Sequence, residues 1–433
     1  MFEKIKQVRR NARERVELTR LIDDCKQLLS ERGEANSVAI ATRALEHYSH
    51  LSVEGRQRFF EVLANNFDPD PGEVLQLAEA YAVNRSPENL IKLSRAAEPP
   101  RQELLRRLNR APGATGAIVK LRAELLEQMR TIRQQNRLIA VDSDLEHLLG
   151  SWFNPGFLTL AKVDWNSPAM LLEKIIHHEA VHEIDGWNDL RRRLQPDRRL
   201  FVFFHPVWPN EPLIFVEVAL VKSMPSAIGP LLDRNLSPEA NENQYKIATF
   251  YSISNCQLGL KGVNLGNFLI KRVAEELKKE FPKLSTFCTL SPIPTFAHWL
   301  LKTEPLQSEL VKPLSLKQLN LGIVALRQKS GGDLSKLEAN EQDQKMLQRL
   351  AAYYLMHTKS SNSVASDPVA RFHLNNGARL ERVNVTADLS KKGLKQSCGA
   401  MVNYLYDLDE IESNHESFIA GEVPVSKALS NSV

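Results

Sequence analysis

The chain has 433 residues, of which 43% are hydrophobic and 25% are charged, which is the composition of an ordinary soluble globular protein with room for two or three cores. The formal net charge of +4 is too small over this length to indicate nucleic-acid binding. No run reaches the roughly 20 apolar residues of a membrane-spanning helix, and the four cysteines are too far apart for a zinc knuckle or a dense disulfide framework.

Residues 1 to about 145 are predicted to form helices separated by short breaks, because Leu, Ala, Arg and Glu dominate and glycine is scarce. Apolar positions in Val74–Val83 are expected to pack inward against a neighbouring helix. No residue in this part indicates catalysis. Turn residues and aromatics begin at Ser151–Gly156, which predicts a boundary between an N-terminal domain, 1–150, and a second domain, 151–433.

A helix is predicted from Pro168 to about Gly186, and it contains the sequence HEAVH at 178–182. HExxH is the pattern of zinc metalloproteases, in which His178 and His182 would bind zinc and Glu179 would activate water. The pattern is short, and no signature of a third ligand follows it. We therefore interpret this stretch as a structural helix and keep a zinc protease as the less favoured alternative.

Two apolar runs, 200–204 and 213–220, are joined by a proline-rich loop and predict an antiparallel strand pair. A strand at Ala248–Cys256 is then followed by a loop with three glycines, an amphipathic helix and a second strand at Ser285–Leu290. Glycines between a strand and a helix N-terminus let backbone N–H groups converge on an anion such as phosphate. A tight turn without a ligand is the alternative.

The C-terminal third is predicted to contain two amphipathic helices, Leu314–Lys329 and Asn340–Thr358, separated by a glycine-containing break. A short helix then ends at Asn376-Gly377 and leads into a strand at Ala378–Val385. The last predicted strand is Ala400–Leu408.

The Gln257–Gly266 loop between a strand and a helix resembles the pyrophosphate-binding segment of GNAT acyltransferases. The motifs FYSIS, GLKGVNLGNFLIKRV, LSPIPTF and FHLNNGARLERVN occur in that order and resemble malonyl-CoA decarboxylases, with a likeness that runs from about Gly150 onward. This resemblance implies an α+β fold: an all-helical N-terminal domain followed by a GNAT-like mixed-sheet catalytic domain with a helical insertion.

The resemblance also implies an activity. The chain would be a carboxy-lyase of fatty acid metabolism that converts malonyl-CoA to acetyl-CoA and CO2 with neither metal nor cofactor. Loss of CO2 leaves a thioester enolate, which needs hydrogen-bond donors and a proton on carbon. A histidine suits the proton transfer because its ordinary pKa is near the working pH.

By resemblance, Ser291 of LSPIP is the proton acceptor or the carboxylate anchor, His373 of FHLNNGA is the proton donor, and Tyr406 of the NYxY motif supports them. CoA would be held by a loop and the start of the next helix. Some family members carry glutamate where this chain has Asn264, which puts in doubt any mechanism that needs a carboxylate there. The implied CoA-binding residues are Lys261, Gly262, Val263, Asn264, Leu265, Gly266, Asn267 and Ile270.

The expected partners are malonyl-CoA and acetyl-CoA, without nucleic acid or membrane, and by resemblance a second copy of the chain, since the helical domain of the family serves assembly into a dimer or tetramer. The N-terminus lacks the apolar core of a signal peptide, and Glu3, Glu14 and Glu17 argue against a transit peptide. The end at Asn431-Ser432-Val433 is not a peroxisomal tripeptide. We therefore expect a cytoplasmic protein. Two further alternatives are a GNAT acyltransferase and a non-catalytic acyl-CoA sensor.

Overall fold

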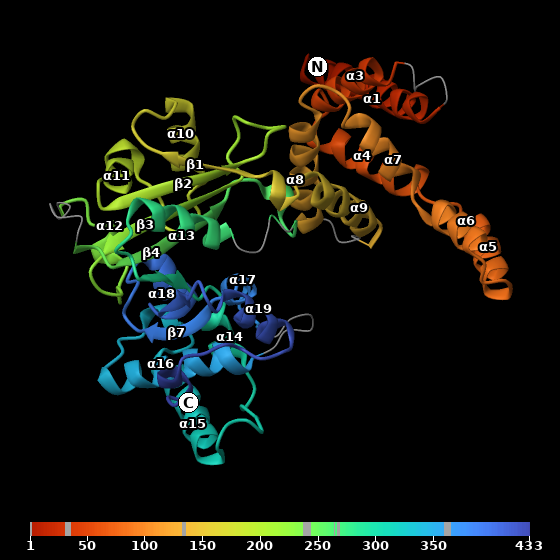
Figure 1. Cartoon of the computed structure of the whole chain (residues 1–433). Helices are drawn as coiled ribbons and strands as arrows, with labels where there is room; N and C mark the ends of the chain where they lie inside the picture. Colours follow the sequence, from red (N-terminus) through yellow and green to blue (C-terminus); the bar gives the residue numbers. More distant parts are fainter. Residues whose placement is uncertain are drawn as a thin grey trace. The chain divides into compact units, whose positions relative to one another are not determined.

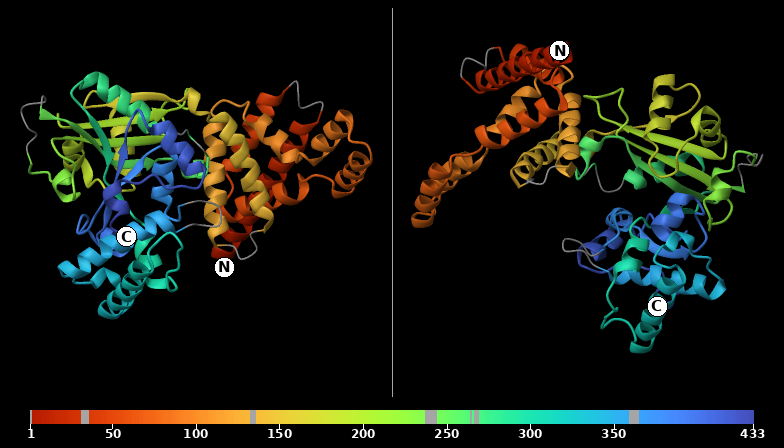
Figure 2. Two further views of the ribbon diagram at one scale, coloured as in Figure 1. Left: turned by 60° about the horizontal axis from the view of Figure 1, so that its bottom comes forward. Right: turned by 180° about the vertical axis from the view of Figure 1, so that it is seen from behind.

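The computed structural model describes residues 2–30, 36–131, 136–236, 244–263, 265, 269–358 and 365–433, which fall into two compact units. The helical unit comprises Met1–Thr159 together with two later stretches, Phe204–Glu211 and Gln257–Leu265. The sheet unit comprises Leu160–Phe203, Pro212–Cys256 and Gly266–Val433. Figure 2 shows the N-terminal helices of the first unit in red to amber and the strands β1 to β4 of the second in yellow to green.

The N-terminal region is helical, as predicted, and its helices start where the sequence supplies caps. Ser52 accepts a hydrogen bond from the Gly55 N–H at the start of one helix, and proline occupies the first turn of three others. Phe60 and Leu125 are among the side chains that form its core. The helices are α1 (Phe2–Leu29), α3 (Ser37–Ser49), α4 (Val53–Asn66), α5 (Pro71–Val83), α6 (Pro87–Ala97), α7 (Pro100–Leu108), α8 (Ala114–Thr131) and α9 (Asn136–Trp152).

The hairpin of α5 and α6 departs from the prediction. The two helices lie side by side (Figure 1), but neither contains a buried residue although both are fully described. Leu75 is 61% exposed and Val83 is 90% exposed. The apolar positions of Val74–Val83 therefore pack against a neighbouring helix only in part: Leu77, Ala78 and Tyr81 are half-buried, whereas Leu75 is exposed, because α6 covers only part of the α5 surface.

The described strands form one mixed sheet in the order β1-β2-β3-β4-β5-β8-β6, with β7 also paired to β8. The pairs β2–β3 and β3–β4 are antiparallel, and β4–β5 is parallel. The predicted antiparallel pair and the α+β fold class are confirmed. The strands are β1 (Thr159–Val163), β2 (Arg198–Phe204), β3 (Ile214–Val221), β4 (Ile247–Asn255), β5 (Thr286–Thr289), β6 (Ser291–Pro292), β7 (Arg379–Asn384) and β8 (Met401–Tyr406).

The parallel pair β4–β5 is connected by the amphipathic helix α13 (Leu269–Glu280). Parallel strands need such a crossover, because a tight hairpin cannot join them. Leu269, Val273 and Leu277 are buried on one side of the helix, and charged residues fill the other side. The predicted succession of strand, loop, helix and strand is confirmed.

The C-terminal helices include the two predicted amphipathic ones, α15 (Pro313–Lys329) and α16 (Glu341–His357), which lie side by side (Figure 1). Asn340 and Asp343 form a capping box at the start of α16. No helix in the described ranges is long and apolar enough to cross a membrane. The other helices are α10 (Ala169–His178), α11 (Gly186–Arg193), α12 (Gly229–Leu232), α14 (Phe296–Lys302), α17 (Pro368–Asn375), α18 (Lys391–Ser397), α19 (Ile411–Ile419), α20 (Lys427–Ser430) and the short 3-10 turns η1 (Pro155–Phe157), η3 (Leu258–Leu260) and η4 (Leu334–Lys336).

Candidate active site

Ser291 lies where the chain leaves β5 and begins the two-residue strand β6. β6 pairs with β8, and the proline that follows Ser291 has no N–H to extend a ladder. The side chain is buried, with 6% exposed. Its Oγ donates a hydrogen bond to Thr289 Oγ1 at 2.9 Å and lies 2.9 Å from His373 Nε2. The structure therefore brings together two residues that are far apart in the sequence.

His373 is held by the two ends of the short helix α17. At the start, the Asp367 carboxylate accepts hydrogen bonds from the N–H groups of Val369 and Ala370. At the end, Gly377 has a φ of +80°, and a Cβ there would approach Ile411 O to 2.2 Å. The glycine of the FHLNNGA motif is thus required by the backbone that follows His373.

Tyr406 completes a three-residue chain of hydrogen bonds. Its hydroxyl lies 2.8 Å from His373 Nδ1. Tyr404, two residues earlier on the same face of β8, stacks on the His373 ring with 4.5 Å between ring centroids. Sequence reasoning missed Tyr404 and Thr289. The period of two that places Tyr404 beside Tyr406, and Thr289 beside Ser291, was the available signal.

Burial determines the protonation states of His373 and Tyr406 in this chain of hydrogen bonds. Burial lowers the pKa of His373 to about 3, so the ring is neutral at pH 7. Burial also raises the pKa of the Tyr406 hydroxyl well above its usual value. A neutral imidazole donates from one ring nitrogen and accepts at the other, so with Ser291 donating to Thr289 the matching tautomer of His373 carries its proton on Nε2 and accepts from Tyr406 at Nδ1. The expectation of a histidine with a pKa near the working pH is wrong for His373.

The CoA-binding residues implied by the resemblance fall in different parts of the structure. Lys261 and Gly262 are exposed and Val263 and Leu265 are buried, all in the helical unit. Ile270 lies in α13 with 1% of its surface exposed, so its side chain is part of the core. Asn264, Gly266 and Asn267 lie outside the described residues.

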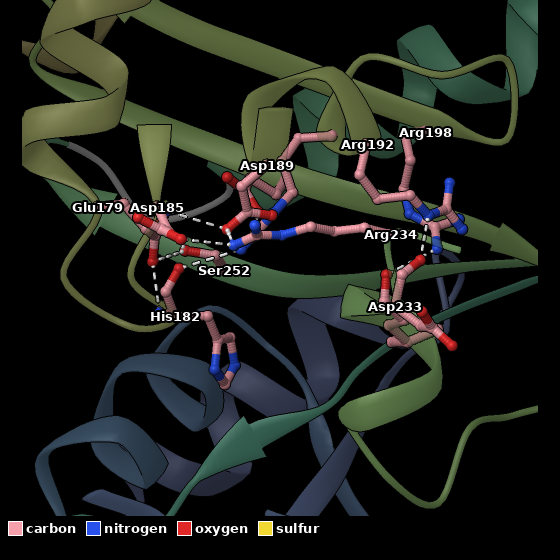
Figure 3. A network of polar contacts seen from close by, with 12 residues as sticks. Glu179, His182, Asp185, Asp189, Arg192, Arg198, Asp233, Arg234 and Ser252 are labelled. Carbon is pink, nitrogen blue, oxygen red and sulfur yellow. Dashed lines mark hydrogen bonds and ion pairs between the residues drawn. The ribbon is translucent and has the colours of Figure 1, made fainter. Parts of the chain in front are cut away.

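The HEAVH sequence does not form the helix of a zinc protease. α10 ends at His178, and the Glu179 carboxylate instead accepts hydrogen bonds from the N–H of His182 at 2.7 Å and from the Ser252 hydroxyl. Figure 3 shows the His182 ring pointing away from that carboxylate. The predicted single helix from Pro168 to about Gly186 is therefore wrong, because Glu179 closes a turn by binding the backbone N–H groups after it. Among the described residues, no group of three or more His, Cys, Asp or Glu is arranged to hold a metal.

We expect His182 to make the fold sensitive to acid. Burial lowers its pKa to about 4 from an ordinary 6.5, so the unfolded chain binds this proton more readily than the folded one. Its contribution to stability is complete above pH 6.5 and is lost as the pH falls toward 4, at up to about 1.4 kcal/mol per pH unit. Urea unfolding measured from pH 7 to pH 4 should show that the free energy of unfolding of His182→Gln falls less steeply than that of the parent chain.

The exposed His177 on α10 provides the matched control. His177→Gln should keep the pH dependence of the parent chain. If His182→Gln loses stability as steeply as the parent between pH 6.5 and 4, the assignment to His182 is wrong.

Comparison of the sequence with models of known protein families identifies the class of protein. The model of the malonyl-CoA decarboxylase C-terminal domain matches residues 156–433, and that of the N-terminal domain of the same enzymes matches residues 67–153. The chain belongs to the malonyl-CoA decarboxylase family. The predictions of the family and of a malonyl-CoA decarboxylase as the enzyme are thereby confirmed.

Particular relatives include the crystal structure of malonyl-CoA decarboxylase from Rhodopseudomonas palustris, which is 45% identical with a TM-score of 0.85 over 96% of this chain and 99% of that one. The enzyme from Agrobacterium vitis is 44% identical with a TM-score of 0.80 over 95% and 99%. The Mus musculus relative is 38% identical and covers 83% of this chain and 78% of its own length.

The expected compartment needs a correction. The curated relatives from Rattus norvegicus, Mus musculus and Anser anser anser are each named "Malonyl-CoA decarboxylase, mitochondrial". These names contradict the expectation of a cytoplasmic protein. The acidic residues Glu3, Glu14 and Glu17 and the missing signal-peptide core were the basis of that expectation, and such local features are weak evidence of compartment.

Proposed function

We propose that this chain decarboxylates malonyl-CoA to acetyl-CoA without a metal, and that Ser291, His373 and Tyr406 are its catalytic residues. The observation that supports this proposal is the buried hydrogen-bonded chain from Ser291 Oγ through both ring nitrogens of His373 to the Tyr406 hydroxyl. Such a chain can move a proton toward a reacting carbon in a site from which water is excluded.

In the proposed reaction, the Ser291 hydroxyl turns from Thr289 to the substrate carboxylate and holds it. The electrons of the breaking carbon–carbon bond pass into the thioester as CO2 leaves, and a buried site favours this step because the carboxylate charge becomes spread over the enolate. The enolate carbon then takes the proton of His373 Nε2. Tyr406 supplies a proton to Nδ1 at the same time, so no imidazolate is left, and a proton taken up from solvent after the product leaves restores the Tyr406 hydroxyl.

The proposal assigns CoA to the Lys261–Asn267 loop and the start of α13. Lys261 is exposed and brings a positive charge, which suits a phosphate. Ile270 lies in the first turn of α13, where helix N–H groups lack an intrahelical acceptor and can bind an anion through the backbone. Its buried side chain is compatible with that role.

The proposal also includes a homo-oligomer, a dimer or a tetramer, assembled through the helical domain, and a division into domains 1–150 and 151–433. The exposed apolar residues of the α5–α6 hairpin support self-association, since Leu75 and Val83 on α5 and Leu90 and Ile91 on α6 leave apolar surface uncovered. A second copy of the chain is the partner with matching chemistry.

The test is a short incubation of the purified chain with malonyl-CoA and EDTA in D2O, followed by mass spectrometry. We expect acetyl-CoA that carries one deuterium in its methyl group, because the relay exchanges with solvent. Malonyl-CoA that stays intact would exclude decarboxylation and leave acyl transfer or CoA sensing. Activity that EDTA abolishes and zinc restores would show that the metal-free part is wrong.

A further inference from the structure

We infer that Arg122 of α8 is a positioning residue for CoA binding, because its guanidinium holds the backbone of the Gln257–Lys261 segment. This inference rests on the proposed function, which gives to CoA the loop that begins at Lys261, where this segment ends. Neither the sequence nor its resemblance singled out Arg122, which lies in a helix without catalytic motifs. Its hydrogen bonds hold the loop backbone in addition to filling space in the core.

The Arg122 side chain is 1% exposed, and the helical unit supplies an acceptor for three of its nitrogens. Nη1 donates to the backbone carbonyl oxygens of Gly259 at 3.0 Å and Lys261 at 2.7 Å. Nε donates to Asp142 at 2.8 Å and Nη2 donates to Glu146 at 3.0 Å, both on α9. A buried charge needs such partners, and two of these four are backbone carbonyls at the start of the proposed ligand loop, those of Lys261 and of Gly259 two residues before it.

The loop backbone is also fitted closely to the two helices that carry this cluster. A Cβ at Gly259 would approach Val119 O of α8 to 1.9 Å, so only glycine allows the loop to lie this close. Gly262 has a φ of +83°, and a Cβ there would approach Glu146 Oε1 to 2.7 Å. The carboxylate that binds Arg122 therefore also borders the turn after Lys261.

The consequence concerns Lys261 and the turn that follows it. The described part of the loop has short-range backbone hydrogen bonds, such as Leu260 N–H to Gln257 O at 2.9 Å and Val263 N–H to Leu260 O at 3.0 Å. Arg122 adds a tie from outside the loop to the carbonyl of Lys261 itself. The exposed Lys261 side chain thus starts from a fixed backbone, which lowers the entropy lost when a phosphate binds.

The experiment compares Arg122→Met and Arg122→Lys with the parent chain on two substrates. One is malonyl-CoA, and the other is malonyl-N-acetylcysteamine, which keeps the thioester end but lacks the nucleotide. We expect Arg122→Met to raise KM for malonyl-CoA at least about tenfold and to leave kcat within about threefold, the pattern of lost binding shared by ground and transition states. Arg122→Lys should recover part of the loss. The kcat/KM for the short substrate should stay within about twofold.

Arg101 of α7 provides the matched control. It is 3% exposed and binds the carboxylates of Asp68 and Asp144, as Arg122 binds two carboxylates, but these ion pairs lie on α9 and before α5 and not on the described part of the loop. Arg101→Met should lose stability and keep KM. An equal fall in kcat/KM for both substrates in Arg122→Met, or an unchanged KM for malonyl-CoA in that variant, would overturn the inference. Failure of the parent chain to consume malonyl-CoA would instead overturn the proposed function.

Discussion

Ser291→Ala is expected to lower kcat for malonyl-CoA by about a hundredfold or more while KM changes little. The substitution removes the hydroxyl that lies 2.9 Å from His373 Nε2 and leaves the CoA loop intact. His373→Asn should lose a similar factor, because it interrupts the chain at its centre. Tyr406→Phe should lose less, since it removes only the outer hydroxyl. Steady-state kinetics with detection of acetyl-CoA measures all three.

The pH profile provides an independent check of the same residues. Because burial lowers the pKa of His373 to about 3, kcat should show no inflection near pH 6.5. Ser285→Ala, at an exposed serine just before β5, is the control and should keep full activity. A Ser291→Ala variant that is folded and as active as the parent would exclude Ser291 from the reaction.

Arg193→Met is expected to reduce the free energy of unfolding by about 3–5 kcal/mol, the cost of leaving one charge of a buried pair without its partner. Arg193 and Glu217 are each 1% exposed and form an ion pair beneath the sheet. Arg193 also donates to His182 O at 3.2 Å, so its loss leaves that carbonyl without this donor. Urea unfolding followed by fluorescence measures the change.

Two variants separate the ion pair from general damage to α11. Arg191→Met removes an exposed arginine of the same helix and should change the free energy of unfolding by less than about 0.5 kcal/mol. Arg193→Met/Glu217→Leu should regain part of the loss, because Glu217 is then no longer left as an unpaired charge, while Asp189 keeps Arg234 as a partner. A double variant as unstable as Arg193→Met alone would contradict this account.

Much of the sheet unit could be predicted because its signals are local. Alternating and continuous apolar runs marked β2, β3 and β4, and helical spacing of apolar residues marked α13 and α16. The motif resemblance gave Ser291, His373 and Tyr406, and the structure places them within hydrogen-bonding distance of one another. Their roles stay predictions until the variants are measured.

The rest depended on tertiary contacts that no window of sequence contains. Helical spacing continues through 178–182, but Glu179 forms its hydrogen bonds to serines of β4 and to the backbone after it, and the helix stops. The lowered pKa of His373 likewise follows from burial between β8 and its neighbours. Arg122 was invisible because its partners at Gly259 and Lys261 lie far along the chain.

The two later stretches that fold with the N-terminal helices limit how this protein can be cut. Trp208 of the first stretch packs so closely on α8 that a Cβ added at Gly116 would lie 2.8 Å from its ring. Gly259 of the second stretch packs on Val119 of the same helix. A fragment that begins at residue 151 would retain both stretches and lose the helix against which they pack. We therefore expect that no cut at a single peptide bond gives two self-sufficient halves, and that domain exchange has to carry both later stretches along with the helical unit.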